Sequence, residues 1–179
     1  MSEAGSNSKQ GPSLKARALR LLSLREYSRK GLGAKLEEAV ARSAQLNKKR
    51  NVGALDQTPI SSEQIAAVLD DFEARGWLSD ERFAESLVRR RSERFGARKI
   101  QDELQRAGID SSKTQELVQT LRDTELQRAY ELWLRKFGQL AQEQKERARQ
   151  YRFLVSKGFS SEIVSKVVAG RLGQLRSEE

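Results

Sequence analysis

The side chains with the clearest chemical use in this sequence are arginines and lysines gathered near the middle of the chain. Six of them share one short stretch: Arg89, Arg90, Arg91, Arg94, Arg98 and Lys99. A guanidinium group presents a planar fork of donors that matches phosphate oxygens. The segment from Gly96 to Lys99 is also expected to begin a helix, where free amides attract anions. We therefore predict contact with DNA or an acidic protein surface. The alternative is a solvated helix face with internal pairs such as Glu85 with Arg89.

Other basic clusters are weaker candidates for the same contact. A second group surrounds an equivalent junction nearer the N-terminus: Arg25, Arg29, Lys30 and Lys35. A third group, Lys48, Lys49 and Arg50, lies in a stretch that we interpret as a loop. A fourth group near the C-terminus is diluted by Glu143 and Glu146: Arg147, Arg149, Arg152 and Lys157.

Most catalytic chemistry is excluded by composition, because the chain contains no histidine and no cysteine. Zinc sites built from these residues, cysteine nucleophiles and Ser-His-Asp triads are therefore impossible. A carboxylate-only metal enzyme stays open, with Asp70-Asp71 and Asp80-Glu81 as its candidates. We interpret the first pair as exposed helix positions and the second as acidic residues at a helix start. We expect no catalytic residue, no metal and no cofactor.

The charge balance indicates an acidic partner. Among 179 residues there are 34 Lys and Arg against 25 Asp and Glu, a net charge of +9. Nucleic acid is the first candidate and an anionic membrane surface the second. No apolar run approaches the roughly 20 residues that a membrane span needs. The N-terminus carries no apolar signal region, and there are no cysteines for disulfides, so we expect a cytoplasmic protein.

A phrase that recurs three times indicates the architecture. An apolar residue is followed four positions later by Gly and then by another apolar residue, with Ser shortly after: Phe72-Gly76-Trp77, Leu104-Gly108-Ile109 and Leu154-Gly158-Phe159. Each copy is typical of a helix end, a left-handed glycine and the cap of the next helix. Repeated junctions of this kind predict tandem helical modules.

The remaining pattern predicts an all-α fold of about nine helices. Proline occurs only at positions 12 and 59, outside the expected helices. We expect three tandem three-helix modules in an elongated, curved array: 14–76, 77–121 and 122–172. Residues 1–13 are expected to form a disordered tail, 47–59 a basic loop after a helix that fades beyond Ala44, and 173–179 a C-terminal tail. Seven aromatic residues are expected in the core rather than as base-stacking platforms: Phe72, Trp77, Phe83, Tyr130, Trp133, Phe137 and Phe159.

Four motifs in series resemble those of the RecX family of bacterial recombination regulators. They are the segment 18–28, Gly76-Trp-Leu-Ser-Asp-Glu-Arg-Phe-Ala84, the segment 96–109 and the segment 153–160. Together the matches cover roughly residues 14–170. The chain departs from the family pattern at Trp77, where Tyr is usual, and at Ser79, where Asp is usual. The insert 47–59 is longer than expected, and Gly31 and Gly33 replace better helix formers, which puts the rigidity of that helix in question.

The resemblance implies a small all-helical modulator of the RecA recombinase, usually inhibitory and without catalysis. Such a protein acts on the RecA–single-strand DNA filament, limiting strand exchange and ATP hydrolysis in the regulation of DNA repair and the SOS response. The resemblance also implies weak, salt-sensitive binding to single-stranded DNA. The polar surface of the chain favours a monomer. The alternatives are a general helical nucleic-acid-binding protein that acts without RecA and, more remotely, a metal-dependent nuclease.

Overall fold

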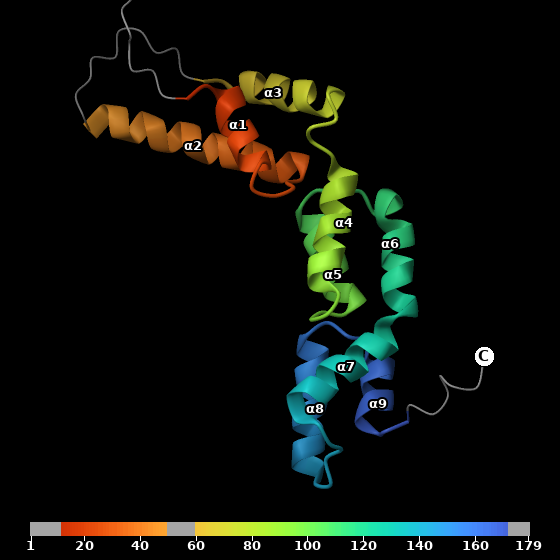
Figure 1. Cartoon of the computed structure of the whole chain (residues 1–179). Coiled ribbons are helices and arrows are strands. Elements are labelled where there is room, and N and C mark those ends of the chain that lie inside the picture. Colours follow the sequence, from red (N-terminus) through yellow and green to blue (C-terminus); the bar gives the residue numbers. More distant parts are fainter. Residues whose placement is uncertain (1–11, 50–59, 172–179) are drawn as a thin grey trace, which may run out of the picture. The chain divides into compact units, whose positions relative to one another are not determined.

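The protein is all-helical in the part that its computed structural model describes, residues 12–49 and 60–171 (Figure 1). Nine α-helices and no strand occur in these ranges: α1 Leu14–Leu22, α2 Arg29–Lys49, α3 Ser62–Ala74, α4 Asp80–Arg91, α5 Ala97–Arg106, α6 Ser111–Asp123, α7 Glu125–Phe137, α8 Gln144–Ser156 and α9 Ser161–Val168. The all-α prediction is confirmed. The expected tails, except for residues 12 and 13, and most of the expected loop lie outside the described residues.

The first compact unit, Met1–Asp80, contains α1, α2 and α3. Its core is centred on side chains with no exposed surface, among them Leu32 and Leu36 from α2 and Phe72 from α3. The helix starts follow from local sequence. The Ser61 hydroxyl accepts a hydrogen bond from the Gln64 amide while the Gln64 side chain accepts one from the Ser61 amide, a capping box.

Helix α2 corrects the expectation that helicity fades after Ala44. The helix continues through Lys49, because this stretch is rich in Ala, Gln, Leu and Lys and carries no Gly or Pro before Gly53. Its two glycines have a packing reason. A Cβ on Gly33 would lie 3.3 Å from Leu69, and one on Gly31 would lie 3.1 Å from the Ser28 hydroxyl. Glycine thus allows α2 to approach its neighbour closely.

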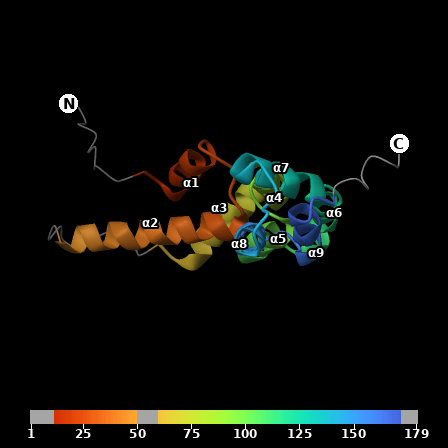
Figure 2. The same cartoon turned by 90° about the horizontal axis from the view of Figure 1, so that it is seen from below.

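The second compact unit, Glu81–Glu179, contains two further groups of three helices. Helices α4 to α6 enclose one core around Ile100 and Leu104, while α7 to α9 enclose another around Trp133 and Leu154. The last three helices lie together in both views (Figure 1 and Figure 2), and α9 packs on α7 and α8. Three helices per core match the tandem modules predicted; the exact module boundaries stay a prediction.

The repeated glycine phrase has the predicted conformation. Gly76, Gly108 and Gly158 adopt positive φ angles of 68°, 81° and 88°. In each copy the amide after the glycine donates back to the carbonyl of the apolar residue that opens the phrase, for example Trp77 to Phe72 at 2.8 Å. This is the hydrogen bond that closes a Schellman motif, and it turns each chain segment sharply into the next helix.

Trp77 is the one aromatic residue for which the expected burial is wrong. It is 45% exposed, whereas the matching Ile109 and Phe159 are buried. Its ring packs edge-on against Phe72 at 5.3 Å and lies under the Arg75 guanidinium at 5.1 Å. The next residue, Leu78, fills the core instead and is 2% exposed. Trp77 therefore covers the last turn of α3 from outside.

Candidate nucleic-acid interface

The central basic residues occupy the last turn of α4 and the first turn of α5. Arg89, Arg90 and Arg91 form the last turn of α4, where cations oppose the negative end of the helix dipole. The turn to α5 carries Arg94, and α5 begins with Ala97, Arg98 and Lys99. Four of the six candidates are exposed (Arg89, Arg90, Arg94, Arg98), while Arg91 and Lys99 are half-buried.

The central candidates differ in how far their charges are neutralised. Arg91 donates to the Glu103 carboxylate on α5 at 3.1 Å, so part of its charge is already paired. In the described part of the chain, Arg90 donates only to the Ser86 carbonyl. Within the described residues, Arg89 forms no ion pair with Glu85, the pair given as an example for a solvated helix face. Exposed, unpaired guanidinium groups are the ones available to an acidic partner.

The Phe95 ring gathers three cations from two helices and a distant turn. Arg91 lies 5.1 Å, Lys99 4.8 Å and Lys157 5.6 Å from the ring centroid. We call Phe95 and these three residues the Phe95 cluster. Each contact is of the cation–π type, in which the face of the ring attracts the positive charge. The fold thus adds Lys157 to the central group, although the sequence placed it in a separate C-terminal cluster.

The start of α5 corrects the expectation of free amides for the first two residues of the stretch from Gly96 to Lys99. The Gly96 amide donates to the Lys157 carbonyl at 3.0 Å, and the Ala97 amide donates to Glu125 Oε1 at 2.9 Å. Glu125 begins α7 and is only 6% exposed. A carboxylate of the protein itself thus takes one of the amides that a phosphate was expected to bind.

Arg128, one turn along α7 from Glu125, is half-buried and holds the same junction together. Its guanidinium donates to the carbonyls of Ser92, Phe95 and Leu121, which belong to the ends of α4 and α6 and the turn between α4 and α5. Burial lowers the pKa of Arg128, and the nearby Glu125 charge opposes that shift. Helix ends leave carbonyls unsatisfied, so a half-buried cation that donates to three carbonyls fixes how α7 packs on its neighbours.

The start of α5 also rests directly on the turn between α8 and α9. A Cβ on Gly96 would lie 2.2 Å from the Gly158 carbonyl oxygen, and one on Gly158 would lie 2.5 Å from the Lys99 Cβ. Only glycine at both positions permits this approach. Glu125, Arg128 and the glycine contact together hold the basic residues of α5 in a defined place relative to α8 and α9.

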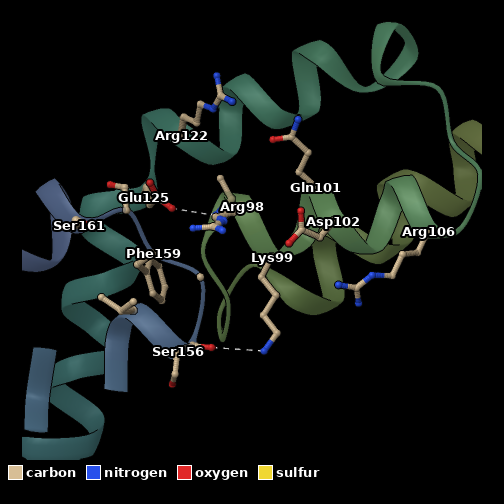
Figure 3. Close-up of a pocket in the computed structure, with 14 residues that line it drawn as sticks. Arg98, Lys99, Gln101, Asp102, Arg106, Arg122, Glu125, Ser156, Phe159 and Ser161 are labelled. Atoms are coloured by element: carbon tan, nitrogen blue, oxygen red, sulfur yellow. Dashed lines mark hydrogen bonds between the residues drawn. The ribbon is translucent and has the colours of Figure 1, made fainter. Parts of the chain in front are cut away.

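This arrangement leaves a pocket of about 850 Å³ between α5, the α6–α7 corner and the α8–α9 turn (Figure 3). Basic residues line it from two helices: Arg98, Lys99 and Arg106 from α5 and Arg122 from α6. Asp102 and Glu125 are the carboxylates of its wall. Figure 3 shows Glu125 bonded at the start of α5 and Lys99 reaching the Ser156 carbonyl at 3.5 Å.

The basic group of the first unit is mostly engaged within the protein. Arg29 pairs with Asp70 and Glu73, and the hydrogen bond to Asp70 raises the pKa of Arg29. Lys35 pairs with Glu38 at 2.8 Å. The Arg25 guanidinium lies 4.4 Å from the centre of the Tyr27 ring and is exposed. Lys30 is exposed and, among the described residues, forms no ion pair. Arg25 and Lys30 are therefore the members of this group that a partner can reach.

The starts of α2 and α5 are capped in the same way, which the sequence did not reveal. At the start of α2, the Arg29 amide donates to the Asp80 carboxylate at 2.7 Å, as the Ala97 amide donates to Glu125. Asp80 and Glu125 are each the first residue of the helix that opens the next three-helix group. In both cases a carboxylate that is distant in the sequence caps the start of a helix.

The third and fourth basic groups add little to the candidate interface. The side chains of Lys48, Lys49 and Arg50 lie outside the part that is described. Arg147, Arg149 and Arg152 are exposed on α8, and Arg149 lies 3.6 Å from Glu146.

Three of the four residues in the acidic pairs bind cations or amides of the protein itself, namely Asp70, Asp71 and Asp80. Asp70 pairs with Arg29, while Asp71 accepts from Lys15 at 2.9 Å and from Arg75 at 2.7 Å. These hydrogen bonds lower the pKa of the Asp71 carboxyl. Across residues 12–49 and 60–171, no three acidic side chains are grouped as a metal ion would require, and no helix is both long and apolar enough to cross a membrane.

Comparison with known proteins gives consistent matches. Family profiles described as the second and third three-helix domains of RecX match residues 79–117 and 123–168. The regulatory protein RecX of Leptothrix cholodnii is 43% identical over 156 residues, 87% of each chain. That of Herminiimonas arsenicoxydans is 41% identical, covering 89% of this chain and 93% of the relative. The crystal structure of RecX from Lactobacillus salivarius has a TM-score of 0.63 at 18% identity, covering 88% of this chain and 93% of the other.

Proposed function

The chain belongs to the RecX family of regulatory proteins, and on that premise we propose that it is a negative regulator of the RecA recombinase. In this proposal it binds the RecA–single-strand DNA filament and inhibits filament extension, ATP hydrolysis and strand exchange. The observation that carries the proposal is the high identity to regulatory proteins over nearly the full length of both chains.

The surface of the α4–α5 corner supports a contact with an acidic filament. Arg89, Arg90, Arg94 and Arg98 are exposed there, and none pairs with a carboxylate among the described residues. DNA phosphates and acidic protein groups are the partners that such cations attract. We propose that this corner makes the main contact, with Arg25 and Lys30 of the first unit as a secondary one. The paired Arg29, Lys35 and Arg91 then serve the fold more than the partner.

The proposed regulator acts as a cytoplasmic monomer without enzymatic activity or cofactor. It influences RecA through binding alone, so DNA should stay intact in its presence. Its own affinity for bare single-stranded DNA should be weak and should fall with salt, because binding would depend on releasing counterions from phosphates.

The test is RecA ATP hydrolysis on single-stranded DNA with this protein added in substoichiometric amounts. A fall in hydrolysis with intact DNA supports filament regulation. Degradation of the DNA in magnesium would instead indicate a nuclease. Size-exclusion chromatography with light scattering measures the molar mass in solution and so tests whether the protein is a monomer.

A general nucleic-acid-binding protein is the second candidate, and the net charge of +9 favours it. It would bind bare DNA tightly at physiological salt and leave RecA hydrolysis unchanged. Fluorescence anisotropy with a labelled oligonucleotide, run beside the hydrolysis assay, separates the two functions.

A further inference from the structure

Of the four exposed arginines of the α4–α5 corner, Arg98 is the one that also lines the pocket between α5, the α6–α7 corner and the α8–α9 turn, so a contact at that corner does not explain the pocket. With about 850 Å³ it offers more room than a few ordered waters require, and it lies in the range of small-molecule sites. Four cations and two carboxylates line it, an excess of two positive charges.

The three arginines of this pocket are free to bind. Arg98, Arg106 and Arg122 are exposed, and within the described ranges no carboxylate lies within ion-pair distance of any of them. This contrasts with Arg91 and Arg29, whose charges are paired inside the protein. Among the pocket's carboxylates, Glu125 is committed to the start of α5. The free arginines are therefore opposed mainly by Asp102.

The placement of these groups favours a ligand with several phosphates. Figure 3 shows Arg98, Arg122 and Arg106 at separate places around the pocket rather than at one point. A single small anion would reach only part of this wall. Guanidinium groups bind phosphate oxygens through paired hydrogen bonds, so successive phosphates would match successive arginines.

Asp102 indicates that the ligand also carries hydrogen-bond donors. The residue lies one helical turn from Arg98 and one turn from Arg106 on α5, in the middle of the basic wall. A carboxylate there repels a bare polyanion but accepts hydrogen bonds from hydroxyl or amino groups. Nucleotides combine phosphates with sugar hydroxyls or base amino groups, whereas pyrophosphate and acidic peptides lack this combination.

The pocket is built before any ligand arrives. The contact of Gly96 with Gly158, the Glu125 cap and the three hydrogen bonds of Arg128 hold its walls together. Binding therefore requires little ordering of the backbone, which favours affinity.

We propose that this pocket binds a nucleotide ligand through two or more of its phosphate groups, with Arg98, Arg106 and Arg122 on the phosphates and Asp102 on a hydroxyl or amino donor. The phosphates come either from consecutive nucleotides of a single strand or from a free nucleoside polyphosphate. The inference deepens the proposed function, but its test contains no RecA, so that failure of one and failure of the other are distinguishable.

The experiment measures binding of two fluorescent probes to the full chain: a hexadeoxyadenylate, whose bases carry amino groups that Asp102 could accept from, and a nucleoside diphosphate. The pocket variant is Arg106→Gln/Arg122→Gln, which leaves Arg98 of the α4–α5 corner in place. The matched control is Arg147→Gln/Arg152→Gln, which removes the same charge from exposed positions on α8. The pocket variant should lose at least about tenfold in affinity for the bound probe, since several charge-assisted hydrogen bonds disappear. The control should lose much less. The probe that shows this difference identifies the source of the phosphates.

A second variant keeps every charge and fills the space. Gln101 lines the pocket from α5, and Gln101→Trp should abolish binding if the ligand enters the pocket but leave it unchanged if the arginines act only by long-range attraction. Circular dichroism and thermal unfolding establish that each variant folds. Asp102→Asn should weaken nucleotide binding while strengthening competition by pyrophosphate.

Three results would overturn the inference. Equal losses in the pocket and control variants would reduce the effect to net charge. Retained binding by the folded Gln101→Trp variant would place the ligand elsewhere. Tighter binding of a polyglutamate peptide than of either nucleotide probe, lost in the pocket variant, would make the pocket a peptide site.

Discussion

Glu125 is an acidic side chain buried to satisfy a helix start. Its carboxylate accepts from the Ala97 amide, and its charge lies near the half-buried Arg128. Glu125→Ala leaves a buried donor without a partner and removes the balancing charge, so we expect a loss of about 2–3 kcal/mol in the free energy of unfolding. Urea denaturation measures it. The exposed Glu131 on the same helix is the control, and Glu131→Ala should change stability by less than about 0.5 kcal/mol. Equal effects would mean that the Glu125 cap contributes nothing.

The stability of the first unit depends on pH through Asp71, whose carboxylate binds two cations. Hydrogen bonds from Lys15 and then Arg75 lower the pKa of its carboxyl below the ordinary value of about 3.8. Because the folded pKa lies below the unfolded one, the stabilisation is present above pH 3.8 and disappears as the pH falls through the lowered pKa. Carbon-13 NMR should show the Asp71 pKa rising in Lys15→Ala. The pKa of Asp110, which the Ser112 amide lowers, should not move.

At the scale of elements, the approach of α5 to the α8–α9 turn depends on glycine for steric reasons. Gly96 has an ordinary φ of −71°, yet an added Cβ would lie 2.2 Å from the Gly158 carbonyl. Gly76 has a φ of +68° but open space around it. Gly96→Ala should therefore cost about 3 kcal/mol or more through overpacking, and Gly76→Ala only about 1 kcal/mol through backbone strain. Thermal unfolding compares the two variants, and an equal or reversed order would contradict the close approach.

The elements that sequence predicts well are those governed by local rules. Glycine stops, serine caps and apolar stripes depend on residues a few positions apart, so Gly76, Gly108 and Gly158 could be identified directly. Contacts over long separations leave no such pattern. Glu125 meets Ala97 across 28 positions and Arg128 meets Ser92 across 36, and both look like ordinary helix-surface charges in the sequence. The candidate arginines could therefore be named from the sequence. The Glu125 bond at the start of α5 and the contact of Lys157 with the Phe95 ring depend instead on packing between modules.

At the scale of the whole molecule, the net charge of +9 is unevenly available to a partner. Many cations are paired within the described residues, as Arg42 is with Glu38 and Lys166 with Glu162. The exposed arginines of the α4–α5 corner are not. The total charge therefore says less about binding than the distribution of unpaired groups, and two variants of equal net charge should behave differently.

The salt dependence of binding to bare single-stranded DNA tests this distribution. Arg89→Gln/Arg90→Gln/Arg94→Gln removes three unpaired cations, and Arg42→Gln/Arg75→Gln/Lys166→Gln removes three that pair with carboxylates. If each unpaired arginine neutralises one phosphate, the slope of log affinity against log salt should become shallower by about 2 in the first variant. The second variant should keep nearly the slope of the unaltered protein. Fluorescence anisotropy between about 50 and 200 mM salt resolves the difference. Equal slopes in both variants would show that the net charge governs binding, and the α4–α5 corner would lose its special role.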